Sequence, residues 1–252
     1  MQSSHICDII YLFLRGEFMI NVNSFQKIYP FTTENIAGYI ENMDVKDKSV
    51  LTVGSSSDQV FNSLLLGAKD VTLFDINEMA PLFYQFKKDL ILKYDREELY
   101  GKVLSNNEFS YFEDNFTKKQ LESMNLYLKN DENYYKLREM LKNSNVTFKF
   151  GNIYDVSKTL KNEKFDRVIL PNVLQYLISE NIENSVSDVY SNLLPYLKSE
   201  SIVQLYYLYN SLYPRHFSKI MEKLYLRNND ILMQLVPFDG NDSAIFVKRK
   251  AK

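Results

Sequence analysis

The 252-residue chain has no tryptophan, one cysteine and two histidines. A single cysteine, Cys7, excludes an intramolecular disulfide and a cysteine-based zinc cluster, and is typical of a reducing cytoplasm. Two histidines alone argue against a histidine-rich metal site. The 30 basic and 32 acidic residues nearly cancel, which argues against a broad positive surface for nucleic acid and leaves a local basic patch open. We therefore expect a cytoplasmic protein without a metal.

Long hydrophobic runs are also missing. The apolar stretch at residues 6–14 is interrupted by Asp8 and is shorter than the roughly 20 residues that a membrane crossing needs. It lacks the basic start and the small-residue cleavage site of a signal peptide. We expect no transmembrane segment, an N-terminal helical extension over residues 1–34, and a single α/β domain over residues 35–252.

Residues 50–75, VLTVGSSSDQVFNSLLLGAKDVTLFD, carry the most informative pattern in the chain. An apolar strand at 50–53 is followed by a loop of one glycine and three serines. A short apolar helix then ends at Gly67, and a second strand at 71–74 leads to Asp75, 21 residues after Gly54. In a strand–loop–helix–strand unit this spacing places an acid on a ribose hydroxyl and the loop under the rest of an adenosine-containing ligand. The pattern predicts a nucleoside cofactor.

The composition of the loop narrows the choice of ligand. A dinucleotide site usually has three glycines, whereas only Gly54 is present here. The serines at 55–57 keep the loop small and add hydroxyl donors. Such a loop suits the carboxylate or amino-acid end of a ligand better than a pyrophosphate. Asp58 is then a helix cap or the partner of an ammonium group. For the loop, the alternative to a ligand site is a capped turn between strand and helix that binds no ligand. For Asp75, the alternative to a ribose contact is a cap for the helical segment that begins at Asn77.

The remainder of the chain alternates helices and strands. We expect helices at 33–43, opened by a Thr33 cap, at 78–93 and at 179–197. Further strands are expected at 146–150, 165–170, 201–209, 231–236 and 244–248, the last two joined by a hairpin turn at 239–242. Residues 94–144 are predicted to form a helical insertion, in which Asp131 caps one helix. The insertion could cover the ligand, form a homodimer surface or only pack against the domain, and the sequence does not distinguish these roles. The pattern predicts an α/β, Rossmann-like fold with a seven-stranded, mostly parallel sheet and a terminal antiparallel hairpin.

Polar residues follow the third and fourth strands. Asn152 and Ile153 follow the third, where an amide suits the adenine edge and an aliphatic chain its face. Asn172 and Tyr176 follow the fourth, at the carboxyl edge of the sheet where ligands of open α/β sheets bind. The candidates for a general base are Asp155, Tyr176 and His216, and the sequence favours none of them.

The order of these pieces resembles the class I S-adenosylmethionine-dependent methyltransferase fold over most of residues 35–250. Within that superfamily, residues 50–77 are similar to a segment of the diacylglycerol 3-amino-3-carboxypropyl transferases of betaine-lipid synthesis, with their leucine-threonine strand, serine-rich loop and Asp-x-Asn. Glu78 and Met79 depart from the Pro and Gln of those enzymes. The resemblance implies S-adenosylmethionine as cofactor, held by Gly54, Ser55, Ser56, Asp58, Asp75, Asn77, Asn152, Ile153 and Asn172.

These features predict a metal-independent transferase that uses S-adenosylmethionine on a small-molecule or lipid-like acceptor. Methyl transfer is the commoner reaction of the fold, and the local resemblance favours the aminocarboxypropyl group instead. The sequence Pro171-Asn172-Val173 differs from the Pro-Pro-aromatic motif of DNA amino-methyltransferases, which argues against nucleic acid. An alternative hypothesis is a non-catalytic module that binds a nucleoside. A third hypothesis, an NAD-dependent oxidoreductase, is disfavoured because the loop lacks the additional glycines of a dinucleotide site.

Overall fold

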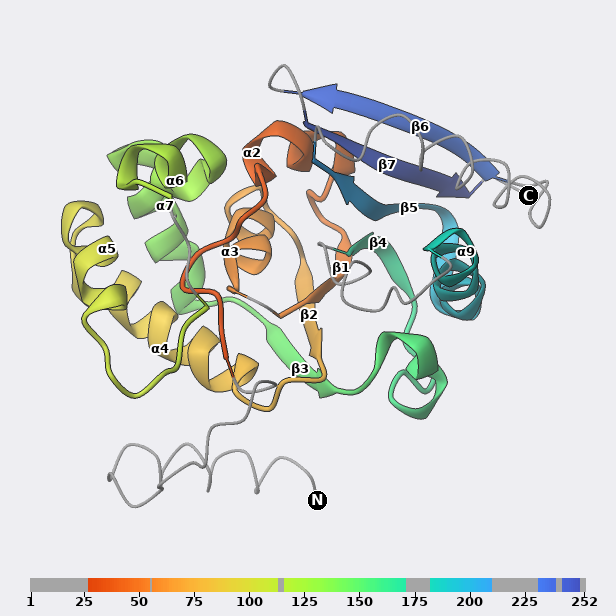
Figure 1. Ribbon diagram of the computed structural model, residues 1–252, viewed down its shortest axis with the longest axis horizontal. Helices are drawn as coiled ribbons and strands as arrows, with labels where there is room; N and C mark the ends of the chain where they lie inside the picture. Colours follow the sequence, from red (N-terminus) through yellow and green to blue (C-terminus); the bar gives the residue numbers. More distant parts are fainter. Residues whose placement is uncertain are drawn as a thin grey trace.

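The computed structural model describes residues 27–54, 56–112, 116–170, 182–209, 231–238 and 242–249 (Figure 1). Within these ranges the chain forms a seven-stranded sheet of order β3-β2-β1-β4-β5-β7-β6. The strands are β1 (Ser49–Val53), β2 (Asp70–Asp75), β3 (Val146–Phe150), β4 (Phe165–Ile169), β5 (Leu197–Leu208), β6 (Ile231–Phe238) and β7 (Asp242–Arg249). Strands β1 to β5 pair in parallel, and β7 lies antiparallel to both β5 and β6. The predicted fold class is confirmed.

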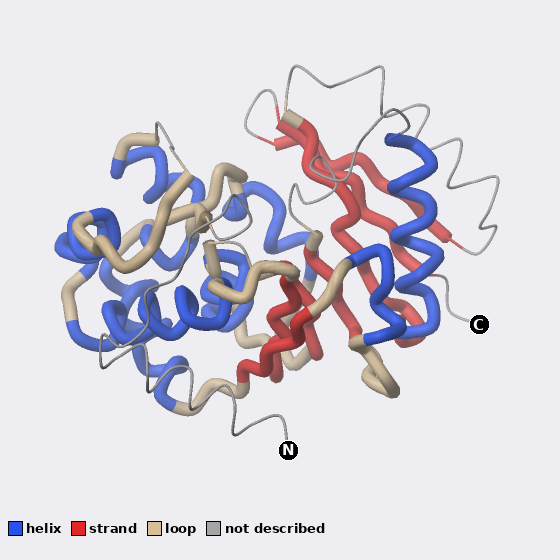
Figure 2. Tube along the Cα trace, turned by 60° about the horizontal axis from the view of Figure 1, so that its bottom comes forward, coloured by secondary structure: helices blue, strands red, loops and turns tan. Residues whose placement is uncertain are grey.

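Helices cover both faces of the sheet (Figure 2). On one face, buried residues of α2, α3, α4 and α7 form one core cluster; on the other, η4 and α9 form a second. The helical elements are α2 (Ile36–Tyr39), η2 (Ile40–Met43), α3 (Asp58–Leu65), α4 (Ala80–Lys93), α5 (Arg96–Leu104), α6 (Lys118–Met124), η3 (Leu126–Leu128), α7 (Asp131–Lys142), η4 (Ile153–Lys158), α9 (Ile182–Leu193) and η5 (Leu194–Tyr196). None of the helices in the described ranges has the length and hydrophobicity that a membrane crossing requires.

Strand β1 shows why this sequence forms a central strand. Its neighbours Val50 and Leu51 point to opposite faces, and each is at most 1% exposed. A continuous run of apolar residues is typical of a parallel strand covered by helices on both sides. The strand order reverses between β1 and β4, so the crevice where such sheets bind ligands lies at the carboxyl ends of these two strands.

Two expected helix caps lie one or two residues from the observed ones. The Asn35 side chain, rather than Thr33, accepts the Gly38 N–H at 3.0 Å and caps α2. Asn130, rather than Asp131, caps α7. In both cases the expected cap has a tertiary partner instead: Thr33 Oγ1 lies 3.0 Å from the Tyr209 hydroxyl, and Asp131 accepts from Arg96. Asparagine is an equally good cap, so the local sequence could not separate the candidates.

The boundary between α9 and β5 also differs from the prediction. The helix was expected to reach residue 197, but α9 ends at Leu193 and continues as the 3-10 turn η5. Pro195 lies in that turn and has no N–H to donate to a longer helix. Strand β5 therefore starts at Leu197, which pairs with Phe165 of β4, rather than at residue 201. The expected start of the helix, residues 179–181, lies outside the described residues.

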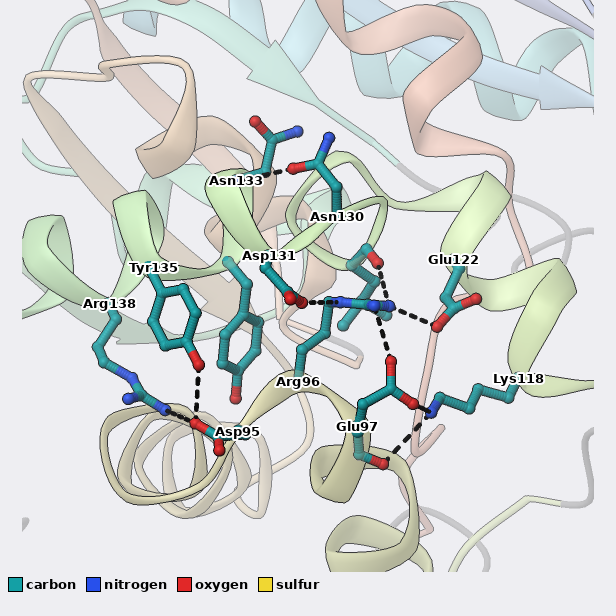
Figure 3. A network of polar contacts seen from close by, with 12 residues as sticks. Asp95, Arg96, Glu97, Lys118, Glu122, Asn130, Asp131, Asn133, Tyr135 and Arg138 are labelled. Carbon is teal, nitrogen blue, oxygen red and sulfur yellow. Dashed lines mark hydrogen bonds and ion pairs between the residues drawn. The ribbon is translucent and has the colours of Figure 1, made fainter.

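Residues 94–144 form helices α5, α6 and α7 with the turn η3, gathered beside α4 (Figure 1). Arg96 joins three of these elements, since its guanidinium donates to Glu97, Glu122 and Asp131 at 2.6–2.7 Å (Figure 3). Helix α7 places Tyr134, Leu137 and Leu141 in the same core as α3 and α4. The segment is therefore packed into the body of the protein.

Candidate functional site

Asp75 and Gly54 meet where β1 and β2 end. Strand β1 pairs with β2 up to the contact of Val53 with Phe74, and Gly54 N–H donates to the Phe74 carbonyl at 3.1 Å. A Cβ atom on Gly54 would lie 2.9 Å from Asp75 Oδ2 and 2.7 Å from a methyl carbon of Leu73. Only glycine allows the loop to approach the carboxylate this closely.

The Asp75 carboxylate is held in place from the other side. Its Oδ1 accepts the Asn77 N–H at 2.9 Å, and Asn77 Oδ1 in turn accepts the Met79 N–H before α4. Asp75 is 9% exposed, and its carbonyl accepts from Gly151 after β3 at 2.9 Å. The capping contact that the sequence offered as an alternative for Asp75 is thus present on one oxygen, while the other faces Gly54.

The serine loop is tightly turned. Ser57 has a left-handed backbone with φ 66°, and its N–H donates to the Gly54 carbonyl at 2.7 Å. Ser56 and Ser57 are both fully buried, and Ser57 Oγ has no hydrogen-bond partner. Ser55 lies outside the described residues. A serine in this conformation, with an unpaired buried hydroxyl, is costly and is the kind of feature that accompanies ligand sites.

Asp58 begins α3, and three protein groups use its two carboxylate oxygens. Oδ1 accepts from Lys87 Nζ at 2.6 Å and from the Tyr127 hydroxyl at 2.7 Å. Oδ2 accepts the Thr32 N–H at 2.6 Å. Burial raises the pKa of the Tyr127 phenol, followed by the Asp58 charge, so this donor stays protonated. The ammonium beside Asp58 is that of Lys87, a contact that no local pattern in the sequence indicated.

Residues 30–35, here called the strap, cross the carboxyl edge of the sheet. On the β1 side they are bound through Thr32 to Asp58. On the β5 side Asn35 N–H donates to the Tyr207 hydroxyl at 3.0 Å, and that hydroxyl donates to Asp242 at 2.6 Å. The strap therefore spans the switch point between β1 and β4. None of the site residues predicted from the sequence lies in this segment.

Asn152 and Ile153 follow β3 and were predicted to contact adenine, but the two side chains lie in different environments. Asn152 is exposed, whereas Ile153 is 4% exposed and belongs to the core with Phe74. The exposed apolar side chains nearest to Asp75 are Ile76, its chain neighbour, and Phe150, which pairs with Asp75 across the strands; each is 51% exposed. An apolar residue directly after the acid of the second strand was the signal that could have identified Ile76.

The candidate bases are not gathered at this site in the part of the chain that the structure describes. Asp155 is partly exposed, and its hydrogen bonds with Lys158 and Ser157 hold its pKa below the usual range, which makes it a weak base. Asn172, Tyr176 and His216 lie outside the described residues. Across the described ranges, no cluster of three or more histidine, cysteine, aspartate or glutamate side chains is arranged to hold a metal ion.

Solved structures share this fold. The chain is similar to a methyltransferase from Pyrococcus furiosus at 11% identity and a TM-score of 0.51, covering 98% of this chain and 99% of that one. It is also similar to the N-methyltransferase NodS from Bradyrhizobium japonicum WM9, solved with S-adenosyl-L-homocysteine, at 12% identity and a TM-score of 0.50, covering 96% and 99%. At such identities the likeness shows the class I methyltransferase fold and does not extend to a substrate.

No protein-family model and no curated protein matches the sequence. The resemblance of residues 50–77 to the aminocarboxypropyl transferases therefore rests on the sequence motif alone.

Proposed function

We propose that this protein is a transferase that binds S-adenosylmethionine at the carboxyl ends of β1, β2 and β3. The observation that carries the proposal is the placement of the Asp75 carboxylate directly beneath the loop at Gly54. A carboxylate at the end of the second strand is suited to accept hydrogen bonds from both ribose hydroxyls.

Two further observations support a fit between these residues and the cofactor. Ile76, the chain neighbour of Asp75, and Phe150, its partner on β3, offer exposed apolar surface beside it, which suits a flat adenine ring. Ser57 Oγ and Gln59 Oε1 are buried without hydrogen-bond partners at the start of α3, which suits a polar amino-acid end. We expect Gly54, Ser55, Ser56 and Asn77 to shape the site, and Asn152 and Asn172 to contact the ligand from β3 and β4.

When bound, S-adenosylmethionine supplies a carbon that is already electrophilic because it is attached to a sulfonium. The protein then has to orient the acceptor and exclude water, and needs no metal for this chemistry. Methyl transfer to a small or lipid-like acceptor is our first assignment. The near balance of 30 basic and 32 acidic residues supports an acceptor other than nucleic acid.

Transfer of the 3-amino-3-carboxypropyl group is the alternative, favoured by the serine-rich loop and Asp-x-Asn of residues 54–77. The two reactions leave different nucleosides. Mass spectrometry of the spent cofactor distinguishes them, because methyl transfer leaves S-adenosylhomocysteine and the alternative leaves 5′-methylthioadenosine. Cofactor binding without either product, across a broad panel of acceptors, would favour a non-catalytic nucleoside-binding module.

Calorimetric titration with S-adenosylmethionine tests the proposal. The wild-type protein should bind it, and Asp75→Ala should weaken binding by about tenfold to a hundredfold, since hydrogen bonds to a charged group contribute about 1.5–3 kcal/mol each. The matched control is Asp70→Ala, which removes the carboxylate at the opposite end of the same strand and should leave binding unchanged. Tight binding of NADH, with none of S-adenosylmethionine, would contradict the proposal.

A further inference from the structure

Lys87 of α4 is fully buried, and its ammonium group bonds three acceptors from three parts of the chain. Nζ lies 2.6 Å from Asp58 Oδ1, 2.9 Å from the Pro30 carbonyl and 3.0 Å from the Ser56 carbonyl. A lysine ammonium has three donors, so these contacts use all of them. The ion pair with Asp58 balances the charge of Lys87, and the two carbonyls connect it with the strap and with the serine loop.

The contact with Ser56 acts on one peptide of the serine loop. In a trans peptide the carbonyl and the N–H point in opposite directions. The Ser56 carbonyl points toward Lys87, and the N–H of the same peptide, which belongs to Ser57, donates to the Gly54 carbonyl at 2.7 Å. The peptide between Ser56 and Ser57 is therefore held on both sides, by α4 and by the residue that begins the loop.

The residue after this peptide explains why the peptide has to be held. Ser57 has φ 66°, in the left-handed region, which costs free energy for any residue other than glycine. Turning the peptide over would bring Ser57 to a negative φ, where a serine is unstrained. Lys87 opposes this change, because a buried ammonium would lose the Ser56 carbonyl as an acceptor. The conformation of the serine loop thus depends on a residue 31 positions beyond Ser56.

We infer that Lys87 is a positioning residue for the ligand: through the Ser56 carbonyl it keeps the serine loop in the conformation that receives the cofactor's amino-acid end. This inference rests on the proposed function and extends the site to α4. Lys87 acts through Ser56 and without touching the ligand. The strap holds the ammonium in place, because it supplies the Pro30 carbonyl and the ring of Phe31, whose centre lies 4.2 Å from Nζ.

Calorimetry with two ligands separates positioning from stability. S-adenosylhomocysteine carries the amino-acid end and 5′-methylthioadenosine lacks it, whereas both carry the ribose that Asp75 is proposed to bind. Lys87→Met should weaken S-adenosylhomocysteine by about tenfold, because only the fraction of protein that keeps the left-handed serine binds it, and should change 5′-methylthioadenosine by less than about twofold. Equal changes in the two affinities, or no change in either, would overturn the inference.

Tyr127→Phe is the matched control. It removes another donor to the same carboxylate oxygen, the hydroxyl 2.7 Å from Asp58 Oδ1, and leaves the contact of Lys87 with the Ser56 carbonyl in place. This variant should be less stable than wild type and yet keep the wild-type ratio of the two affinities. If Tyr127→Phe changes the ratio as much as Lys87→Met does, loss of stability explains both effects and the inference fails.

Ser57→Gly gives a second test, at the loop itself. Glycine adopts φ 66° without strain, so Lys87→Met should weaken S-adenosylhomocysteine by less than about threefold when it is introduced into Ser57→Gly protein. The comparison is made within the Ser57→Gly background, so any contact of the Ser57 hydroxyl with the ligand cancels. A loss as large as in protein that retains Ser57 would contradict the role of the left-handed serine.

If Lys87→Met fails to fold, the double variant Lys87→Met with Asp58→Asn replaces it, because it leaves no unpaired buried charge and still lacks the donor to Ser56. Its ratio of the two affinities should fall in the same way, and an unchanged ratio would refute the inference. The proposed function fails separately, if wild-type protein binds neither ligand or if Asp75→Ala leaves both affinities unchanged; this inference then fails with it.

Discussion

Lys87 donates from Nζ to Asp58 Oδ1 at 2.6 Å, and neither side chain is exposed to solvent. The same ammonium donates to the carbonyls of Pro30 at 2.9 Å and Ser56 at 3.0 Å, and lies 4.2 Å from the ring centre of Phe31. One buried cation thus joins α4, the start of α3 and the strap. The Lys87–Asp58 ion pair therefore connects the ligand loop with the strap.

Lys87→Met should therefore lower the free energy of unfolding by about 3–5 kcal/mol, because it leaves the Asp58 carboxylate buried without its cation. Urea denaturation followed by circular dichroism measures the change. The control is Lys142→Met, which breaks an exposed pair with Glu139 and should have no measurable effect. Adding Asp58→Asn to Lys87→Met should recover part of the loss; a Lys87→Met protein as stable as wild type would refute this account of the pair.

Replacing glycine by alanine should lower the stability of the fold at Gly54 and raise it at Gly101. Gly54→Ala places a Cβ 2.7–2.9 Å from Leu73, Ala80 and Asp75, and should destabilise the fold by about 1–3 kcal/mol. Gly101 lies inside α5 with nothing within 4 Å of a Cβ, so Gly101→Ala should stabilise it by about 0.5–1 kcal/mol. Thermal unfolding of both variants checks the two signs, and a Gly54→Ala protein that is stable and binds ligand normally would contradict the packing argument.

Acid should weaken the fold partly through Asp166. Partial burial acts to raise its pKa, but hydrogen bonds from Lys198 and the Ser49 N–H outweigh this and leave the pKa below the usual value. Because the folded-state pKa is depressed, the stabilisation is present above the unfolded-state pKa of about 3.9 and is lost as pH falls through the folded-state value. Asp166→Asn should thus be less stable than wild type at pH 7, and the difference should shrink as pH falls below about 3.9 and vanish once pH lies below the folded-state pKa. A difference independent of pH would contradict the assignment.

Arg96 should determine how firmly α5, α6 and α7 hold together (Figure 3). Its side chain is 16% exposed, and its guanidinium donates to Glu97, Glu122 and Asp131 as well as to the Leu128 carbonyl. Arg96→Gln should speed amide hydrogen exchange in α6 and α7 while β1 keeps its protection. Lys118→Gln removes only the exposed contact with Glu97 and serves as the control. Unchanged exchange in Arg96→Gln would show that the apolar face of α7 holds these helices without the network.

Local patterns in the sequence were sufficient for the elements of the sheet. Strand β3 lies at residues 146–150 as predicted, and Asp75 ends β2 as expected, because apolar periodicity and turn residues act over a few positions. The wrong predictions concern single residues at the ends of helices. The choice between Thr33 and Asn35 as a cap depended on a hydroxyl from Tyr209, which is distant in the sequence. A cap with a tertiary partner cannot be recognised from its neighbours.

The alternation of helices and strands follows from local periodicity, and the close approach of Gly54 to Asp75 arises within one strand–loop–helix–strand unit. The role of Asp58, in contrast, depends on contacts made in the tertiary structure. Its partners Thr32, Lys87 and Tyr127 are 26, 29 and 69 residues away in the chain, and together they occupy both of its oxygens. Tertiary structure likewise placed the strap, which binds Asp58 through Thr32 and Tyr207 through Asn35. The free energy of a buried carboxylate depends on the donors and charges folded around it, and these come from distant parts of the chain.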